Sequence, residues 1–144
     1  MDAISTRKID EKMIYLDTNV FIYILDKNAE KRFRNISRKI LKRIEKDEVA
    51  ITSFISLMEV LWWCEKNLKD KIKEVYDMIM SYKNLKIINI FSDMFDDALF
   101  FKIKYGLELN DCIALAVMVK SEIDEIYSND TGFDKVDWIK RIFK

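Results

Sequence analysis

Short apolar runs alternate along the chain with longer segments in which apolar residues recur every three or four positions. A short apolar run between polar residues is typical of a buried strand, and the longer spacing is typical of a helix with one buried face. We expect strands at residues 13–16, 49–52, 86–90, 123–128 and within 138–143. We expect helices at 19–26, 30–47, from Ser53 onward, 69–82, 92–105 and from Asn110 onward. Strands joined through helices predict an α/β fold, with a mostly parallel sheet of four to five strands covered on both faces.

Several residues predict where these helices begin and end. Ser53, Ser92 and Asn110 are expected N-caps, because short polar side chains accept hydrogen bonds from the free amides of a first turn. Gly106 is expected to end the helix before it. The helix over 30–47 places its lysines and arginines opposite its apolar stripe, which predicts an exposed and strongly basic face.

Length and composition restrict the class of protein. With 144 residues, half of them hydrophobic, the chain is expected to form one domain over 13–144, after a polar and flexible extension over 1–12. Its 25 basic residues balance 25 acidic ones, so a nucleic acid would have to bind a local basic surface and not bulk charge. The sequence lacks a signal peptide and any apolar run near the ~18 residues of a membrane span, which predicts a cytoplasmic protein with no membrane partner.

The residue types that are rare in this chain exclude several chemistries. Histidine is absent, which removes serine–histidine and cysteine–histidine catalysis and histidine-bound zinc. Only two glycines occur, so a glycine-rich phosphate loop or dinucleotide fingerprint is excluded. Cys64 and Cys112 lie in apolar helical stretches without metal-type spacing, and both are expected to be buried thiols. Trp62 and Trp63 are expected in the core, or for one of them at an interface between two copies.

Four acids stand among apolar residues and are the candidate site. Asp17 and Asp130 each follow a predicted strand, Glu59 shares a helix face with Ser56, and Asp111 lies in the first turn of its helix. In parallel sheets ligands bind beyond the carboxyl ends of the strands, and all four acids can converge there. Two carboxylates ~4 Å apart repel by roughly 4 kcal/mol at an effective dielectric of 20. A divalent cation, Mg²⁺ or Mn²⁺ by the all-oxygen ligand set, would offset that repulsion.

Four segments in order along the chain resemble the PIN-domain family, and particularly its VapC-type toxin ribonucleases. They are LDTNVFIYIL at 16–25, SFISLMEV at 53–60, KYGLELNDCIALA at 104–116 and IYSNDTGFD at 126–134. The resemblance covers nearly the whole chain and implies a three-layer α/β/α sandwich. It also implies a Mg²⁺- or Mn²⁺-dependent endoribonuclease, an antitoxin protein as partner and a homodimer. The glycine often found before the last segment is absent from this sequence.

The resemblance assigns roles to individual residues. It places the family's acidic quartet, catalytic and metal-binding, at Asp17, Glu59, Asp111 and Asp130. Residues that would orient the acids or a water are Thr18, Asn19 and Ser128, with Asp134 as a weaker contributor. Asp17 and Asp111 are the expected direct ligands, and a metal-activated water is the expected nucleophile because histidine is absent.

Other interpretations of the same residues remain open. Asp17, Asp111 and Asp130 could be ordinary turn or helix-start acids, while a buried Glu59 is harder to explain without a partner. A housekeeping PIN nuclease would carry the same acids, and an inactive PIN-like scaffold would bind RNA or protein without cleaving. An aspartyl-phosphate protein would use Asp17 or Asp93, but Asn19 stands where such a phosphatase needs a second acid.

Overall fold

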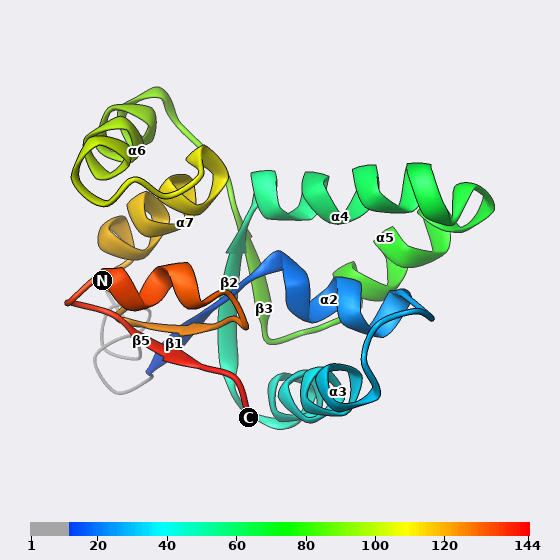
Figure 1. Cartoon of the computed structure of the whole chain (residues 1–144). Helices are drawn as coiled ribbons and strands as arrows, with labels where there is room; N and C mark the ends of the chain where they lie inside the picture. Colours follow the sequence, from blue (N-terminus) through cyan, green and yellow to red (C-terminus); the bar gives the residue numbers. More distant parts are fainter. Residues whose placement is uncertain (1–11) are drawn as a thin grey trace, which may run out of the picture.

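The computed structural model describes residues 12–144 and consists of one sheet with helices on both sides (Figure 1). The strands are β1 (Met13–Leu16), β2 (Val49–Ser53), β3 (Leu85–Ile88), β4 (Glu125–Tyr127) and β5 (Lys140–Ile142). The α-helices are α2 (Thr18–Leu25), α3 (Lys31–Lys46), α4 (Phe54–Asn67), α5 (Ile72–Met80), α6 (Ser92–Tyr105) and α7 (Leu109–Lys120). Two 3₁₀ helices complete the set, η1 (Lys69–Lys71) and η2 (Thr131–Lys135). The extension predicted over residues 1–12 falls almost wholly outside the described residues.

All five strands are parallel, in the order β3-β2-β1-β4-β5. Strands β2 and β3 are added on one side of β1, and β4 and β5 are added on its other side only after α7. The order of the strands therefore reverses between β1 and β4. In open parallel sheets a crevice lies at such a point, beyond the carboxyl ends of the strands.

Two hydrophobic cores lie on opposite faces of the sheet, which makes the fold a three-layer α/β/α sandwich as predicted. Along β1 the side chains alternate: Tyr15 packs with α6 and α7, whereas Ile14 and Leu16 pack with α2 to α5. Figure 1 shows the same division, with α6 and α7 on one side of the strands and α2, α3, α4 and α5 on the other. Helix α7 is buried continuously from Cys112 to Met118, so the body of the helix, directly after Asp111, is packed into the core.

The predicted helix ends agree with the structure in part. Ser53 caps α4 by accepting a hydrogen bond from the Ser56 amide at 3.0 Å, and Gly106 ends α6 with a left-handed φ of 70°. The caps predicted at Ser92 and Asn110 are wrong. Helix α6 begins at Ser92 after an uncapped Phe91, and α7 begins at Leu109, which places Asn110 inside the first turn.

Other local predictions also differ from the structure. The helix predicted over 69–82 is divided into η1 and α5, and the turn η2 was not predicted. Cys64 and Cys112 are buried free thiols as expected. The prediction of a core position is wrong for Trp62, which exposes 56% of its surface, whereas Trp63 packs against the core. Among the described residues, none of the helices is both long and apolar enough to cross a membrane.

Candidate active site

The four predicted acids line one pocket at the carboxyl edge of the sheet, with a volume of about 180 Å³. Asp17 follows β1 and caps α2, and Asp130 follows β4 and caps η2. Glu59 lies in the second turn of α4, and Asp111 lies in the first turn of α7. The pocket thus combines residues from four elements that are distant in sequence.

Asp17 is the most buried of these acids, with 8% of its surface exposed. Its Oδ1 accepts a hydrogen bond from the Thr18 amide at 2.8 Å, which is the capping bond of α2. Its Oδ2 accepts from the Ser128 hydroxyl at 2.5 Å and from the Asn19 side-chain amide at 3.2 Å. The cap role and the position in the pocket therefore coexist in one side chain, whose orientation is fixed by the first residues of α2 and by Ser128, which follows β4.

Glu59 is held by two polar side chains that also contact its acidic neighbours. The Thr18 hydroxyl donates to Oε1 at 3.0 Å, and the Asn110 side-chain amide donates to Oε2. The Asn110 carbonyl oxygen in turn accepts from the Asp111 amide at 3.0 Å. Thr18 thereby connects Asp17 with Glu59, and Asn110 connects Glu59 with the start of α7.

Ser128 connects the remaining acid to the group. Its side-chain oxygen accepts from the Asp130 amide at 3.0 Å while its hydroxyl donates to Asp17. The Asp130 carboxylate accepts from the Gly132 amide at 2.9 Å, which starts η2. Thr18, Asn19 and Ser128, the residues predicted to orient the acids, therefore each form a hydrogen bond with at least one of them.

The pocket concentrates negative charge. Five of its lining residues are acidic, and none of the described residues that line it is lysine or arginine. Burial raises the pKa of Asp17 to about 6, against hydrogen bonds from Ser128 and Thr18 that lower it. Burial raises the pKa of Asp111 to about 8, and the charges of Asp17, Asp130, Glu108 and Glu59 raise it further. The site is therefore built to receive positive charge.

The donor set fits a hard divalent cation in its chemistry and charge, because carboxylate and amide oxygens are the ligands such cations prefer. Over residues 12–144, however, no three acidic, histidine or cysteine side chains already stand close enough together to hold an ion. The carboxylate oxygens of Asp17 and Glu59 accept hydrogen bonds from Thr18 and Ser128, so these oxygens point toward protein donors and not toward a common point. The Asp111 carboxylate accepts no hydrogen bond from the described residues and is free to turn toward an ion.

Asp134 lies apart from this group. Its carboxylate pairs with the Arg141 guanidinium at 2.9 and 3.2 Å, it is exposed, and it does not line the pocket. Two polar residues of the pocket were not predicted as part of the site, Glu108 and Asn110. Both stand within three positions of Asp111 in the segment that carries the family resemblance, and that proximity was the available signal.

The comparison with protein families assigns the chain to a class. The PIN domain model matches residues 14–139, and the chain therefore belongs to the PIN domain family. A comparison with curated protein sequences found no significant match.

Several solved structures share the fold. The chain is similar to VapC20 of Mycobacterium tuberculosis, described as a toxin that cleaves the sarcin-ricin loop, with a TM-score of 0.73 at 16% identity, over 88% of this chain and 96% of that one. It is similar to a toxin–antitoxin complex from Klebsiella pneumoniae (TM-score 0.66, 21% identity, 88% and 95%). It is also similar to VapBC2 of Rickettsia felis, solved with a promoter DNA fragment (0.68, 18%, 90% and 97%). These likenesses confirm the predicted PIN-like fold.

Proposed function

We propose that this chain is a Mg²⁺- or Mn²⁺-dependent endoribonuclease, and the toxin of a toxin–antitoxin pair. The observation that carries the proposal is the pocket in which Asp17, Glu59, Asp111 and Asp130 gather without a cation from the protein. Membership of the PIN domain family supports the same activity. A purely structural role does not explain the pocket, because carboxylates gathered in a partly buried site without a compensating cation destabilise a fold.

Asp17 and Asp111 would hold the ion directly, and Glu59 and Asp130 would complete its surroundings or hold a water. A divalent cation bound there lowers the pKa of a water molecule and offsets the charge of the scissile phosphate. Asp111 is the residue whose protonation matters most, because with a pKa of about 8 it keeps its proton at neutral pH until a cation displaces it.

The polar residues around the acids would fix their geometry during the reaction. Thr18 and Ser128 bind two carboxylates through three hydrogen bonds of 2.5 to 3.0 Å. Partners of this kind typically change metal affinity or activity 10- to 100-fold when they are removed. Asp134, tied to Arg141, would act only indirectly by holding η2.

The partners follow from the relatives. The Klebsiella pneumoniae structure is described as a toxin–antitoxin complex, and we propose an antitoxin protein as the partner of this chain too. RNA is the proposed substrate, and a homodimer is the proposed assembly. A cytoplasmic location is proposed, since both RNA and an antitoxin would be met there.

The activity is tested with purified chain on RNA, with Mg²⁺, with Mn²⁺ and with a chelator. We expect cleavage that requires the ion and is lost in Asp111→Asn, which removes a ligand without adding volume. Circular dichroism should confirm that the variant is folded. Equal cleavage by Asp111→Asn would contradict the proposal, and Mn²⁺ binding without any cleavage would favour the inactive scaffold.

Toxin and housekeeping nuclease are separated in cells. Induced expression of a toxin should stop growth, and co-expression of a small reading frame adjacent to this gene should restore it. Expression of the Asp111→Asn variant should not stop growth, either alone or together with the adjacent reading frame. Growth that continues unchanged with active wild-type protein would favour a housekeeping role in RNA processing.

A further inference from the structure

Two tryptophans follow Glu59 on the same side of helix α4. Trp62, Trp63 and Lys66 stand three, four and seven positions after Glu59, which is the spacing of one helix face. At 1.5 Å per residue, Trp62 lies about 4.5 Å and Lys66 about 10.5 Å further along the helix axis than Glu59. The face of α4 that carries a pocket acid therefore continues as an aromatic surface and then as a basic one.

Trp62 contributes little to the packing of the fold. It exposes 56% of its surface, while Leu57, Val60 and Cys64 bury the opposite side of α4 in the core. Its ring belongs to none of the aromatic pairs formed within residues 12–144. Leaving a large apolar ring in water costs free energy that a smaller or polar residue would avoid. Packing therefore does not explain the exposed ring.

A shallow surface pocket of about 660 Å³ lies over the two tryptophans. Its lining residues are Trp62, Trp63, Glu65, Lys66 and Lys69. Neither lysine forms an ion pair within residues 12–144. The surface pocket thus combines two aromatic rings with two unpaired cations.

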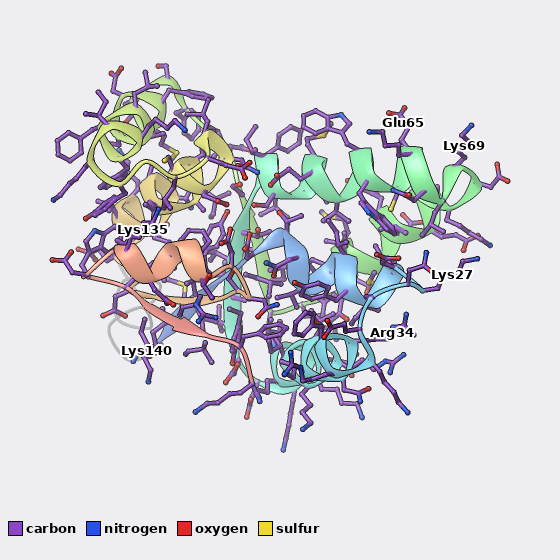
Figure 2. All side chains as sticks on the ribbon, viewed as in Figure 1. Lys27, Arg34, Glu65, Lys69, Lys135 and Lys140 are labelled. Atoms are coloured by element: carbon purple, nitrogen blue, oxygen red, sulfur yellow. The ribbon has the colours of Figure 1, made fainter. Side chains whose placement is uncertain are left out.

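Helices α2 and α4 connect this surface pocket with the acidic pocket. Both helices begin at the carboxyl edge of the sheet, after β1 and β2, and they pack against each other (Figure 1). Thr18 and Glu59 line the acidic pocket near the N-terminal ends of these helices. Lys27 follows α2, and Figure 2 shows it at the same end of the molecule as Lys69. Basic charge therefore lies at the far ends of both helices and acidic charge at their near ends.

We propose that Trp62, Lys66 and Lys69 form a subsite for single-stranded RNA beside the acidic pocket. The inference rests on the proposed ribonuclease function, since the strand that stacks on Trp62 is the one whose phosphate enters the acidic pocket. Any base can stack on an indole because every base has a π-face, and the lysines hold neighbouring phosphates by charge. Nucleotides of one strand are spaced about 3.4 Å along a duplex axis. At that spacing Trp62 receives a base about one to two nucleotides from the cleaved bond.

A single strand fits this surface better than a duplex does. Bases in a duplex are paired and stacked on each other, so an aromatic side chain reaches them only where they are unpaired. The basic face of α3 carries more charge, but α3 supplies none of the described residues that line the acidic pocket. The surface of α4, in contrast, begins at one of those lining residues, Glu59.

The first test is the binding of a short, fluorescently labelled single-stranded RNA to the full chain in chelator, where metal-dependent cleavage does not occur. We expect Trp62→Ala to bind about tenfold more weakly, because it removes one base–aromatic stack. Trp62→Phe keeps a ring and should recover most of the affinity. Phe100→Ala is the matched control and should bind normally, because Phe100 is an equally exposed aromatic residue, at 59%, on α6. Thermal melting should show that all three variants are folded.

The lysines are tested through the salt dependence of the same binding. Lys66→Gln should reduce the slope of log affinity against log salt by about one, because one phosphate contact is lost. Lys42→Gln, on the basic face of α3, changes the net charge equally and should leave the slope near that of wild type. A larger loss of slope in Lys42→Gln than in Lys66→Gln would place the strand on α3 and overturn the proposal.

Cleavage in Mg²⁺ separates this inference from the proposed function. Trp62→Ala should raise KM about tenfold and leave kcat nearly unchanged, since the stack is the same in substrate and transition state. Unchanged KM and unchanged RNA affinity in Trp62→Ala would overturn the subsite while the ribonuclease proposal stands. RNA binding that depends on Trp62 in a wild-type chain that never cleaves RNA would overturn the ribonuclease proposal and support the binding surface.

A protein could occupy the same surface instead of RNA. In that case Trp62→Ala would leave the affinity for single-stranded RNA unchanged and would weaken either self-association of the chain or its complex with an antitoxin. Sedimentation of wild type and Trp62→Ala, with and without the antitoxin, measures both. That result would assign Trp62 to a protein interface and overturn the RNA subsite.

Discussion

The acids of the pocket and the exposed acids of the surface have opposite electrostatic surroundings. Asp134 pairs with Arg141, and Asp93 pairs with Lys120 at 2.9 Å. A hydrogen bond from that cation lowers the pKa of each of these two carboxyls below its ordinary value. In the pocket, burial raises the pKa of Asp17 and Asp111 instead, and no lysine or arginine among the described lining residues compensates them.

This difference distinguishes structural from functional acids. The chain contains as many basic as acidic residues, so partners for the pocket acids were available in principle. The fold instead surrounds them with hydroxyls and amides, which orient a carboxylate without neutralising it. Such a site is costly for stability and suits a cation supplied from solution.

The largest expected effect comes from replacing one acid of the pocket and, separately, one exposed acid of the surface. Asp17→Asn should reduce metal-dependent RNA cleavage about a hundredfold or more, because it removes a charged ligand fixed by three hydrogen bonds. Asp134→Asn should change cleavage less than about threefold, since Asp134 lies outside the pocket. The measurement is the initial cleavage rate of both variants at saturating Mg²⁺. Similar losses of cleavage rate in the two variants would contradict the distinction between pocket acids and surface acids.

A smaller effect is expected from the hydroxyl that orients Asp17. Ser128→Ala removes the 2.5 Å hydrogen bond to Asp17 and the acceptor of the Asp130 amide. We expect a 10- to 100-fold loss in Mn²⁺ affinity or cleavage, with destabilisation of about 1 kcal/mol. Ser128→Thr, which keeps the hydroxyl, is the control and should recover part of the activity. Full activity in Ser128→Ala would show that the bond is not needed.

The same reasoning applies to Asn110, whose side chain joins Glu59 to the start of α7. Asn110→Ala should lower cleavage about tenfold, while Asn67→Ala, at the far end of α4, should not change it. The result is measured on the same RNA substrate. If the two variants are equally active, Asn110 has no positioning role.

The smallest effect concerns stability against pH without metal. Because the folded-state pKa of Asp111 lies near 8, above its ordinary 3.8, the folded chain holds this proton more tightly than the unfolded chain. The contribution of Asp111 to stability is therefore greatest at low pH and is lost as the pH rises from its ordinary pKa of 3.8 to about 8, above which it levels off. The slope is at most about 1.4 kcal/mol per pH unit for one group, and smaller because water reaches part of Asp111. Thermal melts in chelator should fall between pH 6.5 and 8.5 in wild type and stay flatter in Asp111→Asn.

The sequence predicted the parts of this molecule that depend on the pattern of apolar and polar residues along the chain. The alternation of strands and helices defined the parallel sheet, and placing Asp17 and Asp130 after strands was enough to bring them to one edge. The capping bonds of Ser53 and the end of α6 at Gly106 are local, and they were predicted correctly.

The rest depends on contacts between distant segments. Asn110 was predicted as a cap, but the N-cap of α7 is Glu108, two residues earlier, and the Asn110 side chain binds Glu59, 51 positions earlier in the chain. Helical spacing could not show that Trp62 faces solvent while Trp63 faces the core, since α4 is apolar on nearly all sides.

The central claim is that the pocket acids bind a divalent cation and that Asp111 gives up its proton to do so. It is tested most directly by titrating the protein with Mn²⁺ in a calorimeter at pH 7, in two buffers with different heats of ionisation. We predict saturable binding with the release of about one proton, because the pKa of Asp111 lies near 8 before the ion binds. Asp111→Asn should bind more weakly and release no such proton. Absence of saturable binding, or binding that is the same in Asp111→Asn, would contradict the claim.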